Sequence, residues 1–222
     1  MLLLGFVATV AAAPPRNTST LLSSLSASAP QLDPKVLALA LDARDCATRR
    51  GLLGTGVQRL AVIDYTRPSF ETRLWVFDLN HPGLLFAELV ATVAGPATTW
   101  PAVFPTSTAV TNRAWDCSRT AESYTGGNGY SLRMDGLEPG FNDHARDRSI
   151  VMHGAWYVDS GLASKQGRLG RSYGCPAVRP TIARPLIDSL KDGQLLFAYY
   201  PDADWLAHSH VLRCAQAAEE RR

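Results

Sequence analysis

Apolar residues recur along this chain with two different spacings, and the change falls near residue 60. Before that point helix-forming residues predominate. Asp33 is a residue type that caps helix N-termini, and Pro34 suits the first helical position. Gly51 is a residue that ends helices. The pattern therefore predicts one helix over residues 35–50, with Val36, Leu37, Ala40 and Leu41 toward the core.

Beyond this helix the spacing shortens to that of strands. Residues 73–79 alternate in the manner of a β-strand, and the turn-forming residues 80–83 separate them from a further strand. We expect strands over residues 60–65, 73–79, 84–91, 149–153 and 195–200. A short helix is predicted over residues 185–192, where Gly193 ends it. The excess of strands over helices predicts a mainly antiparallel β domain.

The two ends of the chain differ from this middle part. Residues 1–16 are almost wholly apolar up to three alanines, which is typical of an export signal, although a misassigned start in a cytosolic protein is the alternative. Residues 17–32 are rich in Ser, Thr, Ala and Pro, and we expect a flexible tether. One catalytic domain is expected over residues 33–205 and a polar tail over residues 206–222. We expect no integral membrane span in the mature chain, because no other stretch is long and apolar enough.

Composition narrows the class of protein. The chain has 222 residues, of which 46% are hydrophobic, so a packed core is expected. Its formal net charge is +2 and no basic run dominates, which argues against nucleic-acid binding. The four cysteines lack metal-type spacing, so no metal is expected. Cys46 and Cys214 could pair in an oxidising compartment, but the sequence leaves this open. We expect a monomer.

The residues with clear chemical potential lie between positions 149 and 180. His153 and Gly154 directly follow a predicted strand, and Ser172-Tyr173-Gly174-Cys175 comes later, with Cys175 22 residues after His153. A lone cysteine is most often a small buried hydrophobe. This one lies in a glycine-rich loop, and we expect an exposed thiol whose pKa is lowered by neighbouring arginines, namely Arg168, Arg171 and Arg179. The histidine would take the proton of the thiol.

The run HGAWYVDSGLASKQGRLGRSYGCPAV resembles the active-site signature of the murein L,D-transpeptidase catalytic-domain family, of the YkuD type. The resemblance covers most of residues 60–202. It implies a β-sandwich or barrel with a short N-terminal helix and a helix after the loop of the catalytic cysteine. It also implies an exported enzyme of the periplasm or cell envelope that acts on peptidoglycan stem peptides without a cofactor.

The resemblance assigns roles to individual residues. Cys175 would attack the stem-peptide bond before the terminal D-alanine, and His153 would act as general base and acid. A side-chain amine of a second stem would then resolve the thioester and form a cross-link. Backbone N–H groups of Gly174 and Cys175 are candidates for the oxyanion hole. Ser172 would shape the loop and orient the histidine through its backbone carbonyl.

The sequence departs from the commonest family pattern beside the cysteine. Tyr173 stands where that pattern has histidine, and Pro176 begins a run in place of an arginine, although one branch of the family shows Gly-Cys-Pro-Ala. The group that binds the substrate carboxylate is therefore not assigned by the resemblance. Candidate substrate-binding residues are Gly154, Tyr173, Arg171 and Arg133. Trp156 and Tyr157 are expected in the core or in a pocket wall.

Three other functions stay open at this point. Water could resolve the thioester, which would make a carboxypeptidase or endopeptidase. The chain could also be an inactive wall-binding relative. A papain-like cysteine hydrolase fits less well, because such enzymes place the cysteine before the histidine, and here His153 comes first.

Residues 92–118 fit neither the strand pattern nor the family. Translation in the neighbouring frame, which joins each third base to the next two, restores family residues. Some of these are forced by the genetic code: Trp100-Pro101 must give Ala, Trp115-Asp116 must give Gly and Asp116-Cys117 must give Leu. We interpret the segment as bracketed by two compensating frame changes, and Cys117 as a cysteine without a function.

Overall fold

The computed structural model describes residues 18–92 and 116–214. Within them the helices are α1 (Thr18–Ser28), α2 (Pro34–Arg49), α3 (Ser160–Gln166), α4 (Pro180–Leu190) and α5 (Ala203–His208). The strands are β1 (Arg59–Asp64), β2 (Leu74–Asp78), β3 (Gly83–Glu88), β4 (Asp116–Gly126), β5 (Gly129–Gly136), β6 (Val151–Gly154), β7 (Ala177–Val178) and β8 (Leu195–Tyr199). Among the described helices, none combines the length and the apolar character that crossing a membrane requires.

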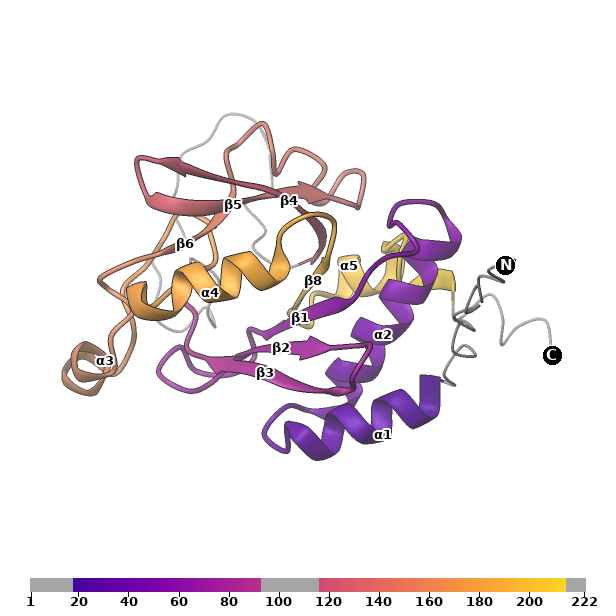
Figure 1. Cartoon of the computed structure of the whole chain (residues 1–222), viewed down its shortest axis with the longest axis horizontal. Helices are drawn as coiled ribbons and strands as arrows, with labels where there is room; N and C mark the ends of the chain where they lie inside the picture. Colours follow the sequence, from indigo (N-terminus) through magenta and orange to yellow (C-terminus); the bar gives the residue numbers. More distant parts are fainter. Residues whose placement is uncertain (1–17, 93–115, 215–222) are drawn as a thin grey trace, which may run out of the picture.

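The strands form a single sheet that curls almost into a barrel (Figure 1), in the order β3-β2-β1-β8-β4-β5-β6-β7. The segment after β3 meets β7 at an isolated bridge, where Ala91 and Ala177 exchange backbone hydrogen bonds of 2.8 and 2.9 Å. Most neighbours are antiparallel, whereas β1–β8 and β6–β7 are parallel. The mainly β fold class is as predicted, and the near closure of the sheet removes most of its exposed edge.

Helices cover both faces of this sheet. Helix α4 lies between the β4–β5 hairpin and strands β1–β3 (Figure 1), and its buried residues pack against one face through Ala61, Ile63, Leu132, Met134 and Met152. The other face packs against α1, α2 and α5 through Leu60, Val62, Trp75, Phe77 and Phe197. Because β1 and β2 are buried on both faces, their strands contribute alternate residues to two separate cores.

The predicted elements are largely present. Helix α2 begins as expected, with the Asp33 carboxylate accepting from the N–H of Lys35 at 2.8 Å. The five predicted strands appear as β1, β2, β3, β6 and β8. Helix α4 begins at Pro180, earlier than the predicted Pro185, because a proline is accommodated in its interior. The sequence pattern did not predict the β4–β5 hairpin.

The flexible tether expected over residues 17–32 was a wrong prediction. Helix α1 occupies most of it, with Leu21 and Leu25 buried four residues apart on one helical face. These side chains pack in the same core as α2. The segment is rich in Ser, Thr and Ala, so its composition did not indicate the single apolar stripe through which α1 packs in the core.

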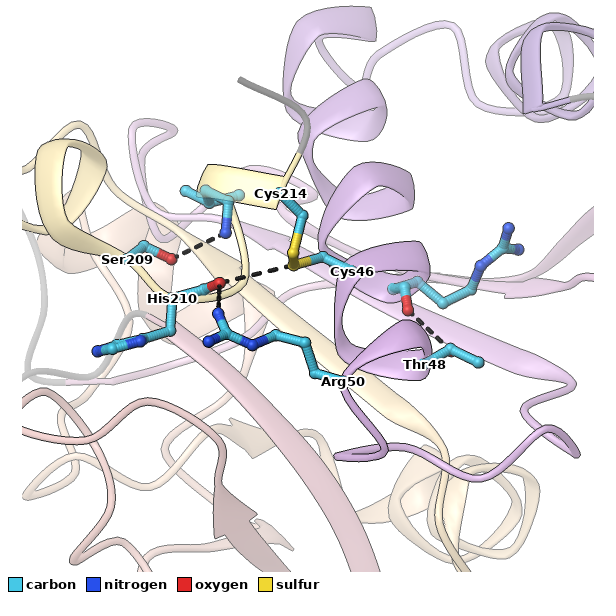
Figure 2. Close-up of a disulfide and its surroundings, with 8 residues drawn as sticks. Cys46, Thr48, Arg50, Ser209, His210 and Cys214 are labelled. Carbon is cyan, nitrogen blue, oxygen red and sulfur yellow. Dashed lines mark hydrogen bonds between the residues drawn. A yellow bond between two sulfur atoms is a disulfide. The ribbon is translucent and has the colours of Figure 1, made fainter. Parts of the chain in front are cut away.

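The polar tail expected over residues 206–222 was also wrong as far as Cys214. Val211 is fully buried and Leu212 nearly so, and a disulfide joins Cys214 to Cys46 of α2 (Figure 2). Beside it, the Arg50 guanidinium donates to the carbonyl of His210 at 2.6 Å (Figure 2). The C-terminal segment is thus fixed to the N-terminal helix pair.

The segment over residues 92–118, which we interpret as altered in frame, falls mainly outside the described residues, and only Thr92 and residues 116–118 can be located. Asp116 begins β4 with φ of 139°, a value that favours glycine, and its side chain is buried. Cys117 is fully buried in the core, and burial raises the pKa of its thiol well above the usual range. The backbone at position 116 therefore favours glycine, position 117 lies in an apolar environment, and the frame interpretation itself stays a prediction.

Candidate active site

The sheet brings His153 and Cys175 into one cleft. Strand β6 carries His153, and the turn that holds Cys175 leads directly into β7, which pairs with β6 so that His153 lies opposite Ala177. The backbone N–H of His153 donates to the carbonyl of Pro176 at 3.3 Å. The parallel pairing thus places His153 opposite a strand that begins two residues after Cys175.

The imidazole of His153 is held in one orientation. The residue is only 6% exposed, and its Nδ1 lies 3.0 Å from the carbonyl oxygen of Gly154. A carbonyl can only accept, so Nδ1 is the protonated nitrogen in the neutral ring and Nε2 is the one that can take a proton. The ring therefore has the tautomer that a general base requires.

The thiol of Cys175 is partly buried against β6. The N–H of Val151 lies 3.5 Å from its Sγ, and the thiol faces the carbonyl of Ser149 at 3.8 Å. Burial raises the pKa of the thiol, while the Val151 N–H and the positive charge of Arg148 lower it to a smaller extent. The prediction of an exposed thiol with a lowered pKa is therefore wrong. The effect of lost hydration on the pKa of the thiol is larger than the effect of the nearby cations.

The three arginines expected to stabilise a thiolate are engaged elsewhere or make no such contribution. Arg179 forms a bidentate ion pair with Glu88, with both contacts at 2.7 Å. Arg168 donates to the carbonyl of Leu169 at 3.1 Å. Arg171 lines the cleft, and burial with the charge of Arg168 lowers the pKa of its guanidinium. The cation that affects the thiol is Arg148, which the sequence did not single out.

A tight turn over Ser172–Cys175 presents the sulfur. The Ser172 hydroxyl donates to the carbonyl of Cys175 and closes the turn, a contact of the kind expected from a residue that shapes the loop. Its expected role in orienting the histidine is not seen, because the ring faces the Gly154 carbonyl instead. Gly174 has φ of 120°, and a Cβ there would lie 3.2 Å from Cδ1 of Ile150. Glycine is therefore required at this position.

The cleft around the two residues measures about 480 Å³. Its lining comes from the β4–β5 hairpin tip, the segment after β6 and the turn before β7: Gly127, Asn128, His153, Gly154, Ala155, Trp156, Tyr157, Arg171, Ser172, Tyr173 and Cys175. The hairpin tip was missed from the sequence, although the GGNG run at residues 126–129 is a strong turn signal between two alternating segments.

The predicted substrate-binding residues divide into two groups. Tyr173, Arg171 and Gly154 line the cleft. Gly154 also lacks a side chain for a packing reason, since a Cβ would meet that of Ala183 on α4 at 3.0 Å. Arg133 is not among the lining residues. Its guanidinium pairs with Glu122 at 3.1 Å and lies over the ring of Tyr124, so the structure does not support it as a substrate anchor.

Among residues 18–92 and 116–214, no group of three or more His, Cys, Asp or Glu side chains could hold a metal ion. The cleft itself brings together a thiol and an imidazole.

A comparison with known proteins identifies a matching family. The family model for the L,D-transpeptidase catalytic domain matches residues 28–199. No curated protein sequence matches the chain. Similar solved structures include an L,D-transpeptidase from Mycobacterium smegmatis, with 13% identity, a TM-score of 0.38, and coverage of 65% of this chain and 60% of that one, so the chain spans less than two thirds of that protein's length. Another is an L,D-transpeptidase from Stackebrandtia nassauensis, with 12% identity, a TM-score of 0.38, and coverage of 82% and 77%.

Proposed function

Because the chain belongs to the L,D-transpeptidase catalytic domain family, we propose that it is a cysteine acyltransferase that cross-links peptidoglycan stem peptides. The observation that supports this most directly is the shared cleft of His153 and Cys175, built by the β6–β7 pairing. A thiol and an imidazole of the correct tautomer in one cleft are the groups that thioester chemistry requires.

The raised pKa of the Cys175 thiol determines how the first step runs. A thiol that is neutral at rest is a weak nucleophile, so a base must remove its proton as it attacks. Nε2 of His153 takes that proton, Sγ bonds to the carbonyl carbon between the diamino acid and the terminal D-alanine, and the C–N bond breaks. The imidazolium returns the proton to the departing amine, and D-alanine leaves.

The second step releases the acyl group. The side-chain amine of a second stem attacks the thioester carbonyl, the C–S bond breaks, and the proton of the amine returns through His153 to the thiolate. The product is a cross-link between two third-position residues. Attack by water at the same carbonyl would give a shortened stem instead, which is the carboxypeptidase alternative.

The proposal also places the protein outside the cytoplasm, in the periplasm or cell envelope. The disulfide between Cys46 and Cys214 supports this location, because such bonds persist in oxidising compartments. A partner of this kind is a polymer of the wall and not a nucleic acid.

Intact-mass spectrometry after incubation with a carbapenem tests the nucleophile. The strained lactam carbonyl stands in for the stem-peptide carbonyl, and ring opening adds one drug molecule to the protein. We expect this gain in the wild type and in Cys117→Ala, which removes the other free thiol of the described residues, but not in Cys175→Ala. His153→Ala should slow the gain by about a hundredfold or more.

The product from a donor stem and an acceptor stem then separates the alternatives, since cross-linked dimer indicates transfer and a shortened stem indicates hydrolysis. If no adduct forms, the assay is repeated on a version with residues 92–118 restored to the other frame. Absence of an adduct in both versions would contradict the proposal and favour an inactive wall-binding relative.

A further inference from the structure

Two aromatic side chains at the cleft are far more exposed than the fold requires. Trp156 is 78% exposed and Tyr173 is 85% exposed, and both line the cleft with His153 and Cys175. The other exposed large hydrophobic side chains of the described residues are Phe70 and Leu85, at 48% and 43%. The two most exposed apolar groups therefore lie beside the same reacting atoms.

Neither ring is needed to form the turn that carries it. Trp156 follows Ala155 in a turn closed by the N–H of Val158 donating to the Ala155 carbonyl at 3.1 Å. Tyr173 occupies the turn that the Ser172 hydroxyl closes. Turn corners ordinarily hold Gly, Pro, Asn, Asp or Ser, whose backbone preferences or short polar side chains favour them. An aromatic ring at both corners contributes little to folding and leaves apolar surface in water.

The backbone beneath these rings is fixed. The N–H of Gly170 donates to the carbonyl of Tyr157 at 3.1 Å, which joins the segment after β6 to the segment before β7. A Cβ at Gly170 would lie 2.5 Å from that of Tyr157, so the two segments are in close contact. The rings of Trp156 and Tyr157 meet edge to face at 5.9 Å. The segment that carries Trp156 is thus held against the segment before β7 at the rim of the cleft.

We propose that Trp156 and Tyr173 form a saccharide subsite for the glycan that bears the stem peptide, an inference that rests on the proposed function. A stem peptide offers methyl groups, short methylene chains, peptide groups and charges, which give an aromatic face less continuous contact than a flat sugar ring does. A pyranose presents a flat C–H face that stacks on the negative face of a ring, with hydroxyls at its edge. Asn128 and Arg171 of the same cleft can donate to those hydroxyls.

The geometry of the substrate agrees with this assignment. The glycan is attached to the first residue of the stem, and the bond to be broken follows the third. Three extended residues reach roughly 10 Å, so a sugar would lie beyond the reacting atoms but still at the rim. The saccharide subsite therefore adds affinity for the donor without entering the chemistry.

The test compares two donors, a disaccharide-tetrapeptide and the free tetrapeptide, in the wild type and in Trp156→Ala/Tyr173→Ala. In the wild type we expect kcat/KM to be on the order of tenfold higher for the saccharide-bearing donor, because its KM is lower. We expect the double variant to lose that preference. Trp156→Phe/Tyr173→Phe keeps two ring faces and should keep most of it. Leu85→Ala, which changes an exposed apolar residue of β3, should keep all of it.

A wild type without preference, or a double variant that retains it, would overturn the subsite. Turnover of neither donor would instead indicate failure of the proposed function. The subsite is then tested independently by titrating the inert Cys175→Ala protein with the free disaccharide and following tryptophan fluorescence. If the disaccharide quenches the fluorescence of Cys175→Ala but not that of Cys175→Ala/Trp156→Phe, the result supports the subsite. If the disaccharide changes the fluorescence of neither protein, the result overturns it.

Discussion

The backbone N–H of Val151 lies 3.5 Å from the sulfur of Cys175, on the strand that also carries His153. This contact and the charge of Arg148 oppose the effect of burial on the thiol, yet the pKa of Cys175 remains raised. Strand β6 thus contacts the sulfur through the N–H of Val151. The same strand carries His153, the proposed base, two residues further on.

Arg148→Gln should move the pH dependence of Cys175 alkylation to higher pH. Removing a cation disfavours the thiolate, so the pKa rises further and the alkylation rate at neutral pH falls, by roughly tenfold if the pKa rises by one. Iodoacetamide labelling followed by mass spectrometry measures this. In the wild type the rate should still be climbing at about pH 8.5, the ordinary thiol pKa, because the folded pKa lies above it.

Arg168→Gln is the matched control, because that guanidinium donates to the Leu169 carbonyl and does not affect the thiol pKa. A labelling rate that levels off below about pH 8 in the wild type would show a thiolate at neutral pH. That result would restore the lowered pKa expected from the sequence.

Gly174→Ala should impair both the turn and acylation. With φ of 120° a side chain is strained at this position, and the new Cβ would press on Ile150, for a cost of about 1–3 kcal/mol. We expect the rate of carbapenem acylation to fall by at least an order of magnitude, with a lower melting temperature. Gly56→Ala is the control, since a Cβ there meets nothing within 4 Å and the melting temperature should be unchanged. If the Gly174→Ala variant is acylated at the wild-type rate, the conformation of this turn is not required for acylation.

Cys46→Ser/Cys214→Ser should destabilise the protein by about 2–5 kcal/mol, because the disulfide closes a loop with a sequence separation of 168 residues. Chemical denaturation of the oxidised wild type and the double variant measures the difference. Carbapenem acylation of the folded variant should proceed normally, since neither residue lines the cleft. Equal stability of the two proteins would indicate that the C-terminal segment is held by Val211 and Leu212 alone.

Asp116→Gly should stabilise the protein. The change relieves a backbone conformation that favours glycine and removes a buried carboxylate, and relief of about 1–3 kcal/mol would raise the melting temperature by several degrees. Asp192→Gly is the control: its φ of 66° is one that Asp tolerates, and the residue is exposed. Resequencing the gene across residues 92–118 provides a separate test of the frame interpretation. If the present frame proves to be the ancestral one, the interpretation is wrong.

The parts of the fold that follow from local chemistry were accessible from the sequence. Asp33 and Pro34 defined the start of α2, and the alternation of residues 73–79 identified β2. Helix α1 was missed because only Leu21 and Leu25 mark its buried face, and their value depends on a partner helix distant in sequence. Near closure of the barrel likewise depends on a contact between Ala91 and Ala177 that no local pattern contains.

The sequence predicted that His153 and Cys175 lie together, whereas it did not predict the pKa of the thiol, and their catalytic roles stay a prediction. The motifs placed His153 and Cys175 together, and the cleft agrees. The number of nearby arginines in the sequence indicated a lowered thiol pKa, whereas the sign is set by burial and by partners such as Glu88, which neutralises Arg179. Charge composition cannot show which cations are already paired.

Ala177 exchanges hydrogen bonds with Ala91 on one side and lies opposite His153 on the other. The bridge that closes the barrel therefore lies beside the proposed active site, so the peptide groups that hold the sheet shut also fix the turn of Cys175 relative to His153. A substitution that loosened this bridge should therefore displace the turn of Cys175 from His153 as well as open the sheet.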